Sequence, residues 1–172
     1  YKTQLIAQFN VPNSNADCSM NMPPVNDQFP IVGWICEVAG PGNDWAAVLV
    51  GQNGVGQRPF DRYGTTMVVA DTIPTEQNGV TVLGYGDDQD QCELADTLQA
   101  SIGKLLSVDD LMLSFNADVT YGSSGSPVLK GGTNKVFGIT THCPCPNVAT
   151  RIDHPNFVAA RDLLFNLSLI HI

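Results

Sequence analysis

Basic residues are scarce in this 172-residue sequence, in which 8 Lys and Arg stand against 17 Asp and Glu for a formal net charge of −9. Nucleic acids and anionic membrane surfaces require clustered positive charge, so we expect neither as a partner. Long apolar runs are also lacking, because the apolar tail 163–172 is interrupted by polar residues. A membrane-spanning helix needs about 20 such residues, and we expect none.

Histidine is equally scarce, since only His142, His154 and His171 are present. All three lie close to the end of the sequence, so any chemistry that needs an imidazole from the first two thirds of the chain is excluded. The first residue is Tyr1 rather than Met, and no apolar signal sequence is visible. We therefore expect a processed or cut start.

The cysteine count is odd, at 5, which leaves at least one thiol without a partner inside the chain. A missing N-terminal segment with a cysteine explains this, and so does one free buried thiol. Cys143 and Cys145 are too close for an unstrained mutual bond, so at least one of them pairs elsewhere, with Cys92 as the leading candidate. A zinc site at His142, Cys143 and Cys145 lacks a second ligand pair, and we expect no metal or other cofactor.

What the sequence does have is a series of short apolar segments separated by turn residues. This spacing predicts an all-β fold built as a sandwich or a pair of barrels. Loops are predicted at 11–30, which Cys18 could hold in place, and at the glycine-rich segment 52–63. One C-terminal helix follows, with Asp153 as its cap and Pro155 in its first turn. The predicted strands are 5–9, 31–35, 46–50, 65–70, 80–83, 99–104, 111–115, 126–129 and 135–141.

The segment Gly122-Ser123-Ser124-Gly125-Ser126-Pro127 is suited to an attacking serine. Glycines on both sides of Ser124 let the backbone turn sharply and leave the hydroxyl accessible. The amides of Gly122 and Ser124 can then point at one spot, where the oxyanion of an acyl-transfer intermediate could sit. The same glycine and serine residues also suit a flexible linker, and that alternative stays open at this point.

A second notable position is Asp44, an acidic residue at the start of the apolar strand 46–50. An unpaired carboxylate that enters a core is costly, so we expect Asp44 to have a dedicated hydrogen-bond partner. The alternative is a solvated turn residue beside Asn43.

Asp44 before an apolar strand, Gly84-Tyr85-Gly86 at the end of another, and the loop around Ser124 resemble the trypsin-like serine peptidases in kind and order. The nearest likeness is to bacterial secreted members, which include the glutamyl endopeptidases. The resemblance implies a trypsin-like double β-barrel with a truncated N-terminal barrel and a C-terminal α-helix. The whole of 1–172 would form one peptidase domain, with 1–75 in the first barrel, 76–152 in the second and 153–170 in the helix.

The histidine of this family is missing from its expected place. In the chymotrypsin triad it precedes the aspartate by about 45 residues, and that position falls before Tyr1. Asp153 directly precedes His154, too close for a triad in the order serine, acid, histidine. We therefore interpret the chain as the downstream part of a peptidase, with the histidine on a separate N-terminal chain.

By resemblance, Ser124 is the nucleophile and the Gly122 and Ser124 amides form the oxyanion hole. Asp44 holds the absent histidine in its working tautomer. The segment Thr140-Thr141-His142 is implied to pair with an extended peptide substrate.

Asp118 falls where trypsin carries the acid that selects lysine or arginine, although in bacterial relatives such an aspartate is often structural. Glutamate selectivity implies a hydroxyl residue at 119 and a histidine at 140; this chain has Val119 and Thr140.

Two functions follow from these residues. The first is an extracellular serine endopeptidase that is incomplete in this chain. The second is an inactive binding or structural protein on a peptidase scaffold, which the missing histidine favours.

Overall fold

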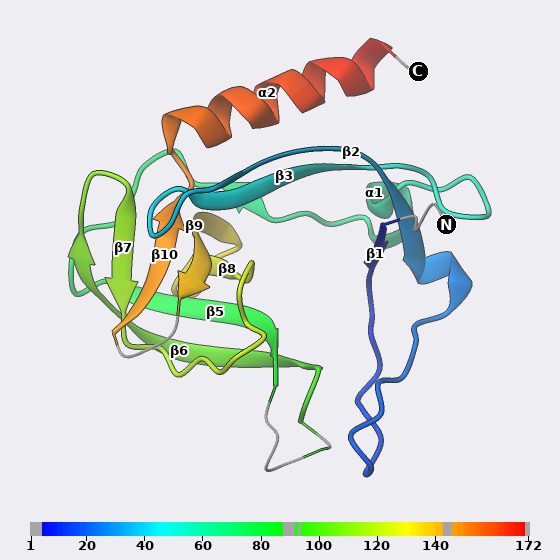
Figure 1. Cartoon of the computed structure of the whole chain (residues 1–172), viewed down its shortest axis with the longest axis horizontal. Coiled ribbons are helices and arrows are strands. Elements are labelled where there is room, and N and C mark those ends of the chain that lie inside the picture. Colours follow the sequence, from blue (N-terminus) through cyan, green and yellow to red (C-terminus); the bar gives the residue numbers. More distant parts are fainter. Residues whose placement is uncertain (1–4, 88–91, 93, 143–145, 171–172) are drawn as a thin grey trace.

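Two β-sheets and a C-terminal helix make up the part of the chain that the computed structural model describes, residues 5–87, 92, 94–142 and 146–170 (Figure 1). The first sheet has the order β1-β2-β3, with β1 at Ile6–Gln8, β2 at Gln28–Val38 and β3 at Asp44–Val50. The second has the order β10-β7-β6-β5-β8-β9-β4, and pairing of β9 with β10 closes six of these strands into a barrel. Its strands are β4 (Val68–Val69), β5 (Gly79–Gly86), β6 (Thr97–Val108), β7 (Met112–Phe115), β8 (Pro127–Lys130), β9 (Lys135–His142) and β10 (Asn147–Arg151).

The barrel closes around side chains that alternate along each strand, as the pleat of a β-strand requires. In β5, Val80 and Val82 point inward and are buried, while Thr81 between them is partly exposed. Large side chains from three other strands, Leu105, Phe115 and Phe137, are fully buried with them. The predicted strands and the all-β class are confirmed by this architecture.

Helix α2 (Pro155–Ile170) lies along one face of the β2–β3 pair (Figure 1). The Phe157 ring meets the buried Trp45 ring edge to face, with 5.6 Å between the ring centroids. Glu37 of β2 accepts hydrogen bonds from the Trp45 indole and from the Asn156 amide, both at 3.1 Å. The helix is thus fixed to the sheet by an apolar contact and by a carboxylate that serves both elements.

Three local features differ from the sequence predictions. His154, not Asp153, caps α2, because the backbone N–H of Asn156 donates a hydrogen bond to His154 Nδ1 at 3.2 Å. Segment 52–63 is not wholly a loop, since helix α1 spans Pro59–Tyr63. Strand β10 was not predicted, because its polar residues do not indicate a strand. It is held as a strand by pairing with β7 on one edge and with β9 on the other.

A disulfide joins Cys18 to Cys92, with 4.3 Å between the Cα atoms. It confirms that Cys18 holds the long loop after β1, and it shows that the predicted pairing of Cys92 with Cys143 or Cys145 is wrong. The physical reason is that Cys18 and Cys92 are 74 residues apart in the sequence, so that only the fold, and no local pattern, brings them together. Cys143 and Cys145 themselves lie outside the described residues, while Cys36 is a free, exposed thiol.

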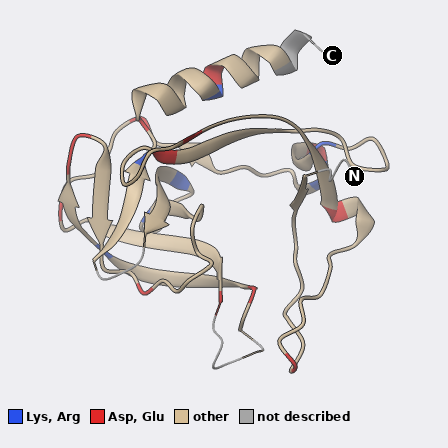
Figure 2. Ribbon diagram, in the orientation of Figure 1, with Lys and Arg blue, Asp and Glu red and all other residues tan. Residues whose placement is uncertain are grey.

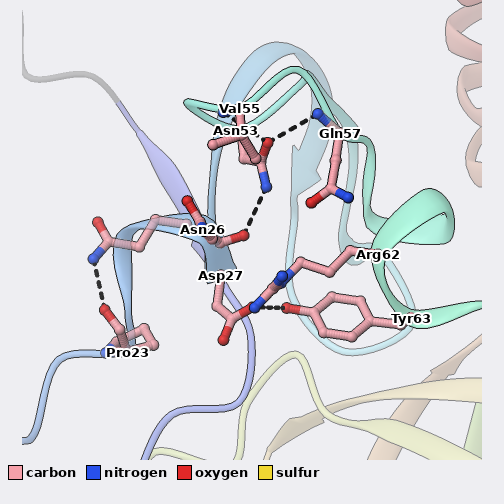
Figure 3. Close-up of polar contacts among 9 residues, drawn as sticks. Pro23, Asn26, Asp27, Asn53, Val55, Gln57, Arg62 and Tyr63 are labelled. Atoms are coloured by element: carbon pink, nitrogen blue, oxygen red, sulfur yellow. Dashed lines mark hydrogen bonds and ion pairs between the residues drawn. The ribbon is translucent and has the colours of Figure 1, made fainter.

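A polar cluster near the start of β2 joins the first sheet to the loop after β3 (Figure 3). The buried Asp27, in the short 3-10 helix η1 (Val25–Asp27), accepts hydrogen bonds from Arg62 Nε and, at 2.7 Å, from the Tyr63 hydroxyl. These hydrogen bonds, of which the one from Arg62 has the largest effect, hold the pKa of Asp27 below its usual range. Asn53 donates to the Asn26 carbonyl at 2.7 Å and so ties the loop to η1.

Charged side chains are dispersed over the ribbon, and Lys and Arg form no concentrated patch among the described residues (Figure 2). Within those residues, none of the helices has the length and apolarity that crossing a membrane requires.

Candidate active site

The loop before β8 presents Ser124 at the surface between two glycines with left-handed backbone. Gly122 has φ +87° and Gly125 has φ +86°, values that a residue with a side chain rarely adopts. Ser124 is exposed, whereas Ser123 and Ser126 are buried. The Ser124 hydroxyl donates to the Thr141 carbonyl at 3.3 Å. The sharp turn and the accessible hydroxyl predicted for this segment are both present, and the loop is an ordered part of the barrel rather than a linker.

Backbone hydrogen bonds fix this loop at alternate amides. The Ser123 amide donates to the Thr120 carbonyl at 3.2 Å, and the Gly125 amide donates to the Thr140 carbonyl at 2.7 Å. Within the described residues, the amides of Gly122 and Ser124 have no backbone acceptor. The two predicted oxyanion-hole donors thus include no amide that is already bonded to the backbone of the described residues.

Two glycines of β5 leave room for the loop. A Cβ atom at Gly84 would lie against the Ser126 side chain, 2.9 Å from its Cβ, and one at Gly86 would collide with the Thr120 hydroxyl. Real Cβ atoms essentially never approach that closely, so both positions exclude a side chain. The lack of side chains at Gly84 and Gly86 thus lets the Ser124 loop pack closely against β5.

Asp44, the first residue of β3, borders the same cleft as Ser124. The Thr150 hydroxyl donates to the Asp44 carbonyl at 2.9 Å and ties the start of β3 to the barrel. The Asp44 carboxylate is half-buried, and its predicted hydrogen-bond partner is not found among the described residues. The cleft has a volume of about 360 Å³ and is lined by Cys36, Val38, Asp44, Trp45, Ala46, Ser124, Gly125, Ile139, Thr140 and Thr141.

The other predicted site residues divide into two groups. Thr140 and Thr141 line the cleft, and both are buried. The Thr140 backbone is already used by the Ser124 loop, because its amide also donates to the Ser126 carbonyl at 2.9 Å. Asp118 and His142 are exposed and do not line the cleft.

His154 caps the start of α2 and is buried. Its side chain is buried beside the Trp45 ring, and its Nε2 lies 3.0 Å from Asn43 Oδ1. With Nδ1 bonded to Asn156, both ring nitrogens are occupied. No histidine of the described residues lines the cleft.

Cys36 and Val38 of β2 are cleft residues that the sequence analysis did not single out. They lie opposite Ala46 and Asp44 in the β2–β3 register. Alternating exposure along β2 was the signal that could have found them, once Asp44 had been assigned to the strand that pairs with it.

Solved structures similar to this chain include a thermostable serine protease, AL20, from an extremophilic microorganism. It has 14% sequence identity and a TM-score of 0.65, with 91% of this chain and 75% of the protease covered. A Glu endopeptidase in complex with MPD also has 14% identity and a TM-score of 0.65, over 93% of this chain and 82% of its own.

The fold is trypsin-like. Identity at this level establishes the trypsin-like fold and carries no activity with it. The sequence matches no protein-family model and no curated protein sequence. The resemblance drawn from Asp44, Gly84 and the Ser124 loop is thereby confirmed for the fold.

Proposed function

We propose that this chain, as one peptidase domain, is part of a secreted serine endopeptidase and supplies its nucleophile and its acid. The observation that carries the proposal is that Asp44 and Ser124, which are 80 residues apart in the sequence, line one cleft. Asp44 begins β3 of the first sheet, and Ser124 lies in the loop before β8 of the second. The Cys18–Cys92 disulfide supports an oxidising compartment and hence secretion.

In the proposed reaction, the Ser124 Oγ attacks the scissile carbonyl carbon while its proton passes to an imidazole in the cleft. The amides of Gly122 and Ser124 donate to the oxyanion that forms. The imidazolium returns the proton to the leaving amine as the C–N bond breaks, and water then hydrolyses the acyl-enzyme. Asp44 orients the imidazole and stabilises its positive form.

The imidazole comes, in this proposal, from a histidine outside these 172 residues. His154 does not supply it, because its two nitrogens are bonded to Asn43 and Asn156. We expect the chain by itself to be inactive, since a positioned general base contributes roughly 10²–10⁴-fold to such a reaction.

For the substrate, the proposal assigns Thr141 and His142 to backbone pairing with an extended peptide. Thr140 instead holds the Ser124 loop. Asp118 is the proposed partner of a basic substrate side chain, which predicts a preference for lysine or arginine that Asp118→Asn removes. An unchanged preference would assign Asp118 a structural role.

The test is labelling of Ser124 by a fluorophosphonate, followed by mass spectrometry, with and without added imidazole. Free imidazole fits a cleft of about 360 Å³, and we expect it to raise the labelling rate at Ser124 at least about tenfold. Asp44→Asn should remove most of this rise, whereas Asp71→Asn, a matched change at an exposed carboxylate, should not.

The peptidase proposal would be contradicted if neither imidazole nor Asp44→Asn changed the labelling rate at Ser124. Labelling of other serines at a similar rate would contradict it too. The second candidate function, a binding or structural protein on the same scaffold, would then hold. The observation that favours it is that no histidine of the described residues lines the cleft.

A further inference from the structure

The turn between β2 and β3, residues 39–43, leads directly into Asp44 and is held by two buried side chains of one segment. The Thr150 hydroxyl, at the end of β10, donates to the Asp44 carbonyl at 2.9 Å. Further along the chain, His154 Nε2 lies 3.0 Å from Asn43 Oδ1. Thr150 is fully buried and His154 is 4% exposed, so bulk water has little access to either contact.

The hydrogen-bond partners of His154 determine where its ring proton lies. Because Nδ1 accepts the backbone N–H of Asn156, Nδ1 carries no proton. The proton of the neutral ring is then on Nε2, which donates to the side-chain oxygen of Asn43. The ring packs beside the buried Trp45 indole, with 6.2 Å between the ring centroids. One side chain thus joins the first turn of α2 to the residue before Asp44.

The same part of the barrel also holds the Ser124 loop. The Thr140 carbonyl of β9 accepts the Gly125 amide at 2.7 Å, and Thr140 pairs with Ala149 of β10. Strand β10 runs up to the start of α2 beside the β2–β3 turn (Figure 1). Asp44 belongs to the first sheet and the Ser124 loop to the second, so their separation depends on contacts of this kind between the sheets.

We propose that His154 is a positioning residue for Asp44, which it holds through the side chain of Asn43. The neutral ring keeps the turn 39–43 against the end of β10 and so keeps Asp44 beside the cleft. Neither His154 nor Asn43 lines the cleft. A shift of about 1 Å in a catalytic group can lower a rate roughly 10²-fold, so a residue outside the cleft can matter in this way. This proposal rests on the proposed function, in which Asp44 orients an imidazole, and adds the residue that orients Asp44.

Two substitutions separate positioning from the capping of α2. His154→Asn keeps an oxygen where Nδ1 accepts the Asn156 N–H, and asparagine is a favoured cap, but it has no atom in the place of Nε2. His154→Gln keeps an amide N–H in the place of Nε2 and loses the cap. The positioning role therefore fails in His154→Asn and is rescued in His154→Gln, whereas a purely capping role requires the reverse.

The first measurement is hydrogen exchange at the Ala39 amide, which donates to the Asn43 carbonyl at 2.9 Å and closes the turn. We expect His154→Asn and Asn43→Ala to raise its exchange rate at least about threefold, the size of effect that loss of one hydrogen bond produces. His154→Gln should leave the rate close to that of the parent. Asn156→Ala is the matched control, because it removes a bond of 3.1 Å from the same turn of α2 to Glu37 but keeps the N–H that His154 accepts.

The second measurement is fluorophosphonate labelling of Ser124 in the same variants, with and without imidazole. We expect His154→Asn and Asn43→Ala to reduce the imidazole-dependent rise at least about threefold. Labelling without imidazole should not change, because neither residue lines the cleft. The double variant should lose no more than either single variant, since both changes remove the same hydrogen bond.

The two measurements together separate this proposal from the proposed function. An imidazole effect in the parent that His154→Asn leaves unchanged would retain the function and overturn the positioning role. A parent without an imidazole effect, in which His154→Asn still speeds exchange at Ala39, would reject the function and retain the hold of His154 on the turn. Equal changes in His154→Asn, His154→Gln and Asn156→Ala would overturn the proposal, because a general loosening of α2 would account for all three.

Discussion

Two β5 glycines, at opposite ends of the same strand, meet very different surroundings. A Cβ atom at Gly84 would press on the Ser126 side chain, while one at Gly79 would have no neighbour within 4 Å. We expect Gly84→Ala to lower the free energy of unfolding by about 1–3 kcal/mol through overpacking. We expect Gly79→Ala to change it by about 0.5 kcal/mol or less. Urea unfolding of both variants measures the difference, and equal effects would contradict the close packing of the Ser124 loop on β5.

Asp27 should make the stability of the first sheet sensitive to acid. Its pKa is lowered in the folded state by hydrogen bonds from Arg62 and Tyr63. The stabilisation is therefore complete above the pKa of the unfolded carboxyl, about 3.9, and is lost as the pH falls through the lower folded value. Urea midpoints from pH 7 to pH 2 should fall more steeply in the parent protein than in Asp27→Asn. Asp110→Asn, at an exposed carboxylate, should follow the parent; parallel curves for Asp27→Asn would contradict the prediction.

How far residues can be predicted from sequence depends on whether their role is local. The Ser124 loop was predictable because glycine spacing dictates its turn within six residues. The Asp27–Arg62 contact and the Cys18–Cys92 bond were not, because they join segments far apart in the sequence whose approach only the fold determines. The buried position of His154 was missed for the same reason: its partner Asn43 lies 111 residues earlier in the sequence, in the turn between β2 and β3.

At the scale of elements, α2 shows how a moderately apolar helix is oriented by a few contacts. Leu164 is buried and faces Gly33 of β2, whereas the adjacent Leu163 is 52% exposed. We expect Leu164→Ala to cost about 2–5 kcal/mol and Leu163→Ala to cost less than about 1 kcal/mol. Thermal or urea unfolding checks this, and a reversed order would mean that α2 packs through its other side.

Elements were predicted well where apolar residues recur along the segment, as in β5 and β9, and poorly where they are few. Strand β10 contains Asn147, Thr150 and Arg151 and becomes a strand through pairing on both edges. Helix α1 is only 5 residues long, too short for helical periodicity to show. The cleft residues on β2 became recognisable only when the register with β3 was known.

At the scale of the whole molecule, the Cys18–Cys92 bond joins the loop between β1 and β2 to the segment between β5 and β6, and so ties the first sheet covalently to the barrel. The bond closes a long loop, so the double variant Cys18→Ser with Cys92→Ser should lose about 2–5 kcal/mol. For a chain of this size that corresponds to a drop in Tm of roughly 5–15 °C. Cys36→Ser should leave Tm unchanged in the isolated chain. Scanning calorimetry measures both, and equal Tm values for the parent and the double variant would contradict the prediction.

The same disulfide encloses the whole of the exposed 54–56 loop and the connection 71–78 in a covalent ring. Exposed loops of this kind are where proteases nick folded proteins. A molecule cut once anywhere between Cys18 and Cys92 keeps both fragments attached, so it migrates as an intact species of about 18.4 kDa until a reductant is added. A backbone break in this half of the chain therefore leaves Asp44 and Ser124 in one covalently connected molecule.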